Sequence, residues 1–269
     1  MKKLLIVLFS LLLSVALFAE GTTEKATTSS ASRTVSVIAS TSWTAAFADL
    51  GGAEKIQIIA PASLIHPPEY EITVSDVVKI DKADYFIYAG YERMMQSMGD
   101  AIGKTNTDLI QINTDNSIEN VKKQASLIAA SLRSQYYSED RVYDYIQTVE
   151  NGKQAVAAKG LDKLKVYCHA MQIYLAKDLG LQVGGTFGPG PLTASQIAEV
   201  AKGGYDIIID NVHNPIASPL LEVSPNTKLV VWRNFPEKVE RASLQKMVQA
   251  NIDSLLKLII GNPCGILNP

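Results

Sequence analysis

The sequence predicts an α/β fold of two lobes with mostly parallel sheets, joined by a long bridging α-helix. Short β-branched segments alternate with helical segments in both halves of the chain, and this alternation is typical of parallel sheets whose faces are covered by helices. A helical stretch without strand signals separates the halves. The length of 269 residues also suits two lobes of about 100 to 120 residues each.

The first half opens with the β-branched run TVSVIAS, residues 34–40, which predicts a strand. WTAAFADLGG then has the apolar spacing of a short helix that stops at a Gly-Gly pair. TVSDVVKIDKA, residues 73–83, predicts a helix with Thr73 or Ser75 as its cap. Three more strands are expected in this half, at residues 55–60, 84–90 and 108–112.

Two helical stretches connect the halves, from about 117 to 134 and from about 138 to 158, and the second has apolar residues at intervals of three, four and seven. About twenty helical residues span roughly 30 Å, which is enough to join two lobes. We therefore assign the N-terminal lobe to residues 34–135, the bridging helix to 136–160 and the C-terminal lobe to 161–269.

The strand–helix alternation resumes in the second half. Strands are predicted at KVYCHA (165–170), QVGGTF (182–187), YDIIID (205–210) and KLVVW (228–232). Helices are predicted at residues 170–179, 193–202 and 242–260. No internal repeat is evident in the sequence itself.

The first nineteen residues, MKKLLIVLFSLLLSVALFA, combine two lysines, an apolar run and a small final residue. This pattern predicts a secretory signal peptide over residues 1–19, with an uncleaved anchor as the alternative. The polar stretch 20–33 predicts a disordered tether. No cysteine follows the apolar run, so we expect an exported, periplasmic or otherwise extracytoplasmic protein without a lipid anchor.

The net charge bears on which partners the protein can bind, and the two cysteines raise the question of a disulfide. The formal net charge of −2 gives no reason to expect nucleic acid or an anionic membrane as a partner. Cys168 and Cys264 could form a disulfide in an oxidising compartment, or stay as two separate thiols. Neighbouring side chains on an extended segment point to opposite faces, so Cys168 is expected in the core if the adjacent His169 is not.

The chain has three histidines, and each follows a predicted strand. His66 lies in the loop after the second strand, His169 closes the strand KVYCHA, and His213 follows YDIIID. Ligands of open α/β sheets bind beyond the carboxyl ends of the strands, and neutral imidazole is a common ligand of zinc and other transition metals. A single histidine there is more often structural, but three together favour a shared metal ion.

A closed tetrahedral zinc site needs a fourth ligand. Glu92, in YAGYERMM, follows a strand of the first half and would give each lobe two ligands, with a solvated glutamate paired to Arg93 or Lys82 as the alternative. Asp115, Asp210 and Glu237 are weaker candidates, and Asp210 is also placed to accept a hydrogen bond from a ligating imidazole.

Three other stretches are interpreted structurally. ERMMQSM has helical spacing and predicts core packing rather than a thioether metal site. GGTFGPGP, residues 184–191, lacks the strand and helix context of a phosphate-binding loop and predicts a hinge-like or cleft-lining loop. Packing along the long helix is expected for Tyr136, Tyr137, Tyr143 and Tyr145.

Two motifs carry a resemblance to a known family. IHPPEYEITVSDVVKIDKADYFIYAGYE resembles the first-lobe motif, and YCHAMQIYLAKDLGL the second-lobe motif, of the zinc/manganese substrate-binding proteins of bacterial ABC importers. The resemblance extends from about residue 34 to 260. The chain departs from the family where Pro68 precedes EYE and where INTDNS and WRNFPEK lack the usual histidine and aspartate, so only His169 falls directly on a family ligand position.

The resemblance implies a monomeric, non-enzymatic receptor that captures a divalent transition metal between two lobes and delivers it to an ABC permease in the inner membrane. The predicted ligand set is His66, Glu92, His169 and His213. Its imidazoles suit Zn²⁺ better than Mn²⁺. The alternatives are a zinc-dependent hydrolase with a three-histidine site, a receptor for a metal chelate or small anion, and an adhesin or scaffold with structural histidines.

Overall fold

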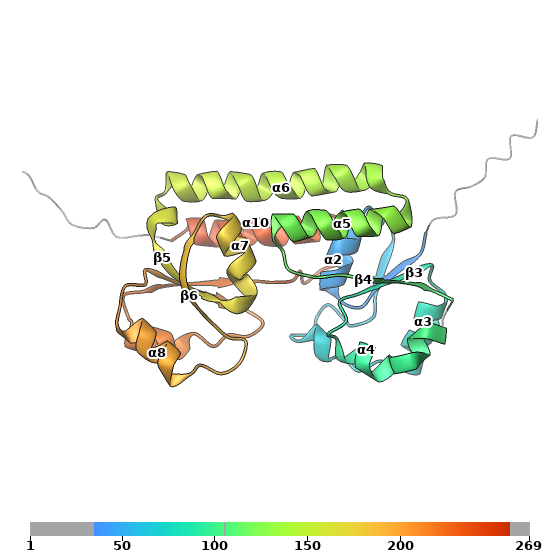
Figure 1. Ribbon diagram of the computed structural model, residues 1–269, viewed down its shortest axis with the longest axis horizontal. Coiled ribbons are helices and arrows are strands. Elements are labelled where there is room, and N and C mark those ends of the chain that lie inside the picture. The colour runs from blue at the N-terminus through green and yellow to red at the C-terminus, as the bar shows by residue number, and fades with distance from the viewer. Residues whose placement is uncertain (1–34, 105, 259–269) are drawn as a thin grey trace, which may run out of the picture. The chain divides into compact units, whose positions relative to one another are not determined.

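Two four-stranded parallel sheets organise the computed structural model, which describes residues 35–104 and 106–258 (Figure 1). The first sheet has the order β2-β1-β3-β4 and the second the order β6-β5-β7-β8, and each strand pairing in them is parallel. The strands are β1 (Val37–Ala39), β2 (Ile56–Ile58), β3 (Tyr85–Tyr88), β4 (Asp108–Gln111), β5 (Lys165–His169), β6 (Gln182–Phe187), β7 (Ile207–Asn211) and β8 (Lys228–Trp232). The predicted fold class is confirmed.

Helices cover both faces of the first sheet. On one face lie α2 (Ser42–Leu50) and α5 (Ile118–Leu132), and on the other lie α3 (Val74–Asp81) and α4 (Arg93–Met98) (Figure 1). The α2 helix starts at Thr41, whose side chain forms a capping box with Thr44. Met94 and Met98 of α4 are buried in the apolar cluster on the second face, which confirms the interpretation of ERMMQSM as core.

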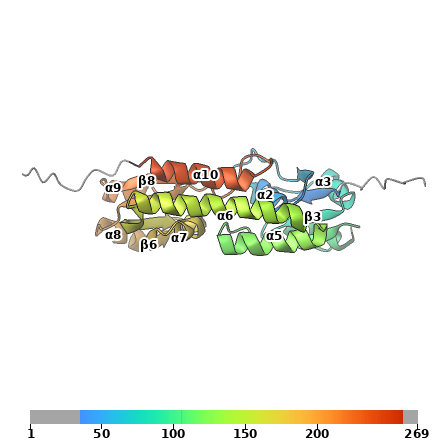
Figure 2. The same cartoon turned by 90° about the horizontal axis from the view of Figure 1, so that it is seen from above.

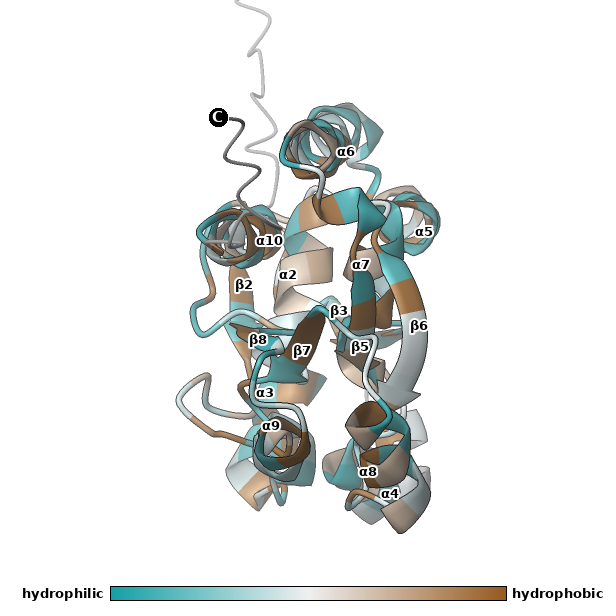
Figure 3. Cartoon of the chain, turned by 90° about the vertical axis from the view of Figure 1, so that its left-hand side faces the viewer, coloured by the Kyte–Doolittle hydropathy of each residue, from teal (hydrophilic) through white to brown (hydrophobic). Residues whose placement is uncertain are grey.

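The second sheet is covered in the same way. Its faces carry α7 (Ile173–Asp178) with α10 (Ser243–Leu256), and α8 (Ala194–Ala201) with α9 (Ser218–Val223). The end-on view separates these layers, with β5, β7 and β8 between them (Figure 3). The inner strand β7 is buried at each of its five positions, as expected of parallel strands covered on both sides.

The bridging helix is α6 (Gln135–Ala158). It packs against α2 and α5 of the first lobe and against α7 and α10 of the second (Figure 2). Tyr145 points into the core and is fully buried, but Tyr136, Tyr137 and Tyr143 are exposed. The prediction that all four tyrosines pack is therefore wrong for three of them, because they lie on the helix face that neither lobe covers.

The start of α10 is tied back to the first lobe. Oδ2 of Asp49, at the end of α2, accepts a hydrogen bond of 2.8 Å from the backbone N–H of Ala242. Arg141 of α6 donates to the Asp49 carbonyl at 2.6 Å, to its Oδ1 at 3.1 Å and to the Ala53 carbonyl at 2.8 Å. Three elements are thus joined at one buried carboxylate, and burial raises the pKa of Asp49 despite these donors.

Cys168 is fully buried in the main apolar cluster, as predicted, and burial raises the pKa of its thiol to about 12. Its proposed disulfide partner Cys264 lies outside the described residues, as do the predicted signal peptide and tether. Among the helices in the described ranges, none is both long enough and apolar enough to span a bilayer.

Candidate functional site

A cavity of about 480 Å³ lies where the loops after all eight strands converge. Both lobes line it. The first lobe contributes Trp43, Ile65, His66, Pro68, Glu69, Tyr91 and residues 113–116, and the second contributes Met171, Tyr174, Pro189, Asn211, His213, Asn214, Asn234 and Phe235. In both sheets the first strand along the chain lies between the next two, and ligands of such sheets bind beyond the carboxyl ends of the strands at this change of direction. The cavity is therefore the candidate binding site.

His213 lies in the cavity wall of the second lobe, just after β7. Its ring stacks on Phe235 with 3.6 Å between centroids and an interplanar angle of 19°, and the side chain is buried. Burial and the nearby Arg233 guanidinium lower the pKa of His213 to about 4, although the backbones of Phe235 and Ile65 oppose this. No well-formed hydrogen bond satisfies Nε2. The imidazole is therefore neutral at pH 7, which is the form that binds metals.

His66 lines the same cavity from the first lobe. It is exposed, directly precedes the short 3₁₀ helix η1 (Pro67–Glu69) and makes no side-chain cap there. It lies close enough to His213 for a charge on its ring to disfavour protonation of His213. One imidazole from each lobe thus lines the same cavity.

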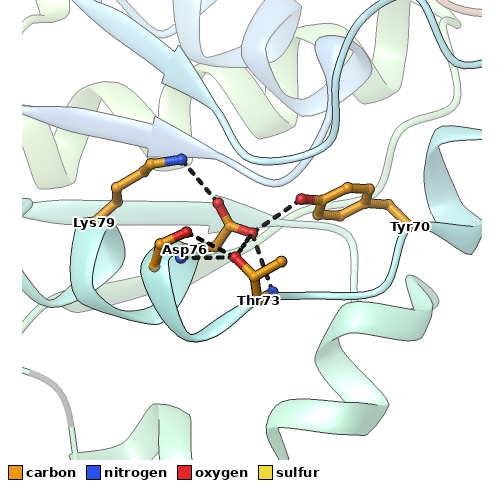
Figure 4. Close-up of polar contacts among 5 residues, drawn as sticks. Tyr70, Thr73, Asp76 and Lys79 are labelled. Atoms are coloured by element: carbon orange, nitrogen blue, oxygen red, sulfur yellow. Dashed lines mark hydrogen bonds and ion pairs between the residues drawn. The ribbon is translucent and has the colours of Figure 1, made fainter.

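The loop that carries His66 is anchored at its far end by the start of α3 (Figure 4). The Tyr70 hydroxyl donates to Oδ2 of Asp76 at 3.0 Å, Thr73 forms a capping box with Asp76, and Lys79 contacts Oδ1 at 2.9 Å. Burial alone would raise the pKa of the Asp76 carboxyl, but the hydrogen bonds outweigh it and hold the pKa at about 2. The TVSD motif thus acts as a structural anchor for the loop.

His169, at the end of β5, has no exposed surface. Its Nδ1 accepts the backbone N–H of Met171 at 3.1 Å, so Nε2 carries the proton and donates to Oδ1 of Asn214 at 2.9 Å. Both ring nitrogens are therefore occupied by protein groups. His169 is also absent from the residues that line the cavity.

Glu92 is fully buried. Its Oε1 accepts from the Ser40 hydroxyl and from Ala89 N–H at 2.8 Å, and its Oε2 accepts from Gly90 N–H at 2.6 Å. These bonds fix the turn after β3 to the end of β1. The alternative of a solvated glutamate paired to Arg93 is also not observed, because Arg93 pairs with Glu71 at 2.7 Å.

The weaker carboxylate candidates have three different environments. Asp115 lines the cavity and accepts hydrogen bonds from Asn113 and Ser117. Asp210 is buried and accepts the backbone N–H groups of residues 211 and 217, at 2.8 and 3.0 Å, rather than a histidine ring. Glu237 is exposed, pairs with Arg233 and does not line the cavity. Asp210 therefore shapes the loop that carries His213.

The structure does not gather the four predicted ligands. Within residues 35–104 and 106–258, no group of three or more His, Cys, Asp or Glu side chains is placed to hold a metal ion. His66 and His213 share the cavity, whereas His169 and Glu92 are hydrogen-bonded inside their own lobes. The position of a residue after a strand predicted which end of the sheet it lies at. Its hydrogen-bond partners, some in the local turn and some distant in the sequence, decide whether its side chain enters the cavity.

Most residues that line the cavity were not predicted from the sequence. Five asparagines line it, at positions 113, 116, 211, 214 and 234, together with the aromatic residues Trp43, Tyr91, Tyr174 and Phe235. INTDNS and WRNFPEK, which lack the expected ligands, supply part of this wall. The sequence did carry a signal for them, because each of these residues ends a strand or follows one within a few positions. The only charged residues in the lining besides the histidines are Glu69 and Asp115.

Comparison with known proteins identifies solved structures with a similar fold. No protein-family model matches the sequence, and no curated protein matches it. The substrate-binding protein FpvC from P. aeruginosa, solved with Ni²⁺, is similar with a TM-score of 0.66 at 17% identity, over 87% of this chain and 100% of that chain. A Cd-bound periplasmic metal binding protein from Candidatus Liberibacter asiaticus has a TM-score of 0.61 at 16% identity, over 82% and 97% of the two chains.

The laminin-binding protein Lbp of Streptococcus pyogenes also matches, with a TM-score of 0.59 at 17% identity over 82% of this chain and 97% of that chain. At such identities the likeness establishes the fold. The described chain therefore has the two-lobed fold found in metal-binding substrate-binding proteins.

Proposed function

We propose that this protein is an extracytoplasmic receptor that captures a divalent transition-metal ion, zinc in preference, in the cavity between its two lobes. The observation that carries the proposal is the presence of His66 and His213 in one cavity, each from a different lobe. An ion bound by both rings would link the lobes, so the loaded and empty forms would differ in geometry. An ABC permease could distinguish them, and we propose it as the partner.

The cavity chemistry supports a cation. Burial and Arg233 keep His213 neutral, and the carboxylates of Glu69 and Asp115 line the same cavity. Imidazole nitrogen with carboxylate oxygen is a common ligand combination for zinc. His169 and Glu92 would join the coordination only after giving up the hydrogen bonds that they make in the structure.

We propose a binding role rather than catalysis. A three-histidine hydrolase site is not assembled in the described part of the chain, since His169 is turned into its own lobe. The sequence also has no HExxH helix motif to supply a metalloprotease site. We also propose that the protein is exported and acts as a monomer. The proposed export depends on the signal pattern of residues 1–19.

Metal analysis of protein purified without added metal, followed by competitive titration with zinc, tests the proposal. We expect one tightly held zinc ion per chain, and at least roughly tenfold weaker binding in both His66→Ala and His213→Ala. Asp115→Asn should weaken binding to a smaller extent. Glu237→Gln, which removes an exposed carboxylate outside the cavity, is the matched control and should leave affinity unchanged.

A protein that binds no divalent metal would overturn the proposal. Unchanged zinc affinity in His66→Ala or in His213→Ala would remove that residue from the site. Equal losses in His169→Ala and His66→Ala would show that the buried ring rearranges to bind the ion.

A further inference from the structure

We propose that the metal enters this cavity as a small organic complex of net positive charge, and that the lining between the lobes holds the organic part. This inference rests on the proposed metal binding and names the form in which the metal is carried. Five features of the cavity support it: its volume, the absence of a gathered set of metal donors in the described residues, its aromatic walls, its charge and an unpaired buried amide.

The cavity is large for an ion. A volume of about 480 Å³ falls within the ~300–1,000 Å³ that is typical of sites for small organic molecules. A single metal ion bound to two side chains would leave most of this space to solvent. A complex with a ring-sized organic ligand would occupy it.

The metal donors of the cavity are not gathered around one point. Two imidazoles and two carboxylates line it, yet nowhere in the described ranges do three or more His, Cys, Asp or Glu side chains form a group that could hold a metal. Zinc generally takes four ligands. An organic ligand that supplies two donors would complete such a shell with His66 and His213.

Aromatic side chains from both lobes surround the space. Trp43 and Tyr91 belong to the first lobe, and Tyr174 and Phe235 follow strands of the second. Phe235 contacts Trp43, with 5.7 Å between centroids, and stacks on His213. Tyr91 and Tyr174 are about half exposed, at 49% and 43%. Exposed rings of this kind are suited to stack on a planar ligand.

Charge restricts the ligand further. Glu69 and Asp115 are the charged residues of the lining apart from its histidines, and no lysine or arginine belongs to it. A free anionic ligand would meet carboxylates without a compensating cation. A metal complex that keeps a positive charge would be attracted, as would an organic cation, because aromatic faces also favour positive charge.

One buried amide favours a ligand with an acceptor atom. The Nδ2 donor of Asn116 is buried without a hydrogen-bond partner, and this residue lines the cavity. A metal cation cannot accept a hydrogen bond from the Asn116 amide. An organic ligand with a carboxylate or amide group can do so once that side chain turns toward it, and this favours a complex over the ion alone.

Native mass spectrometry and isothermal titration calorimetry of the whole protein can separate the forms. The probes are Zn²⁺ alone, zinc with one equivalent of picolinate, zinc with one equivalent of 2,2′-bipyridine, zinc nitrilotriacetate and picolinate alone. The picolinate and bipyridine complexes are cations with planar organic ligands, and nitrilotriacetate makes the complex anionic. Picolinate has a carboxylate that bipyridine lacks.

We expect a ternary complex of one protein, one zinc and one picolinate, with zinc bound at least about tenfold more tightly than without picolinate. Bipyridine should give a weaker ternary complex, and nitrilotriacetate should only withdraw zinc. Tyr174→Leu should weaken the ternary complex about tenfold. Tyr143→Leu, an exposed tyrosine of α6 outside the cavity, is the matched control and should behave as wild type.

Tight binding of zinc alone, with both planar co-ligands excluded from the complex, would overturn this inference and leave the proposed function intact. Absence of zinc from every arm would overturn both. Binding of picolinate without zinc would also contradict the inference, because it would identify the cavity as a site for organic acids.

Discussion

Nε2 of His169 lies 2.9 Å from Oδ1 of Asn214, and this contact joins the end of β5 to the loop after β7. Nδ1 of the same ring accepts the backbone N–H of Met171. The histidine that best fits the family motif therefore works in this structure as a fully bonded connector between two cavity loops. The Asn214 side of that contact lines the cavity.

Replacement of Asn214 by alanine should destabilise the protein, because it leaves the Nε2–H of the buried His169 ring without an acceptor. We expect the free energy of unfolding to fall by about 1–3 kcal/mol, measured by urea denaturation without metal. Asn226→Ala, on an exposed turn, is the control and should change it by less than about 0.5 kcal/mol. Equal stabilities would show that the ring needs no acceptor.

Substitution of Gly188 by alanine should be costly. A Cβ at this position would lie 2.5 Å from Nε2 of His169, and the backbone has φ of +72°, a conformation that L-residues adopt at a cost of about 1–2 kcal/mol. Because the Cβ would also overlap the His169 ring, we expect the free energy of unfolding, measured by urea denaturation, to fall by about 2–3 kcal/mol. Gly190→Ala is the matched control, because a Cβ there meets nothing within 4 Å, and it should fold with wild-type stability.

Substitution of Glu92 by glutamine should destabilise the protein, because it removes a buried carboxylate that accepts several hydrogen bonds. The carboxylate accepts the Ser40 hydroxyl and two backbone N–H groups, whereas a glutamine amide has one acceptor oxygen and would turn its NH₂ toward a donor. We expect a loss of about 2–4 kcal/mol in unfolding free energy. Glu71→Gln removes an exposed carboxylate that is paired with Arg93, and a loss of similar size there would mean that generic charge removal causes the effect.

Asp76 should make the free energy of unfolding depend on pH in the acid range. Its pKa is lowered from 3.8 to about 2, so the folded state favours the carboxylate more than the unfolded state does. The resulting stability of about 2 kcal/mol is present above pH 4 and is lost as the pH falls toward 2. We expect Asp76→Asn to be less stable than wild type by that amount at pH 6, and the two urea curves to converge near pH 2.

A constant difference between the two proteins at every pH would show that packing at the helix start, rather than charge, explains the effect. Asp253→Asn, an exposed carboxylate on α10, controls for general changes in charge.

Local sequence patterns predicted the fold because they depend on near neighbours. TVSVIAS and YDIIID are β-branched runs that fit strands covered on both faces. β1 lies within the first, and β7 overlaps the second and extends one residue beyond it. Thr73 was named as a cap, and its side chain does form the capping box of α3. Apolar spacing predicted a helix from about 138 to 158, and α6 runs from Gln135 to Ala158.

The predicted ligands fall into two groups in the structure. His66 and His213 line the cavity, since residues just after a parallel strand lie at that edge of the sheet, and their role as metal ligands stays a prediction. His169 and Glu92 satisfy the same rule but are held by Asn214 and by Ser40, residues far away in the sequence. Sequence spacing carries no information on such partners.

By itself, the sequence determined the two parallel sheets, the helix that joins them and the edge at which a ligand can bind, because hydrophobic periodicity and capping act over a few residues. Only the tertiary structure decided which side chains enter the cavity and which are tied into the lobes. The reason is that hydrogen bonds to buried His169 and Glu92 come from other strand ends, and those ends meet only after the chain has folded.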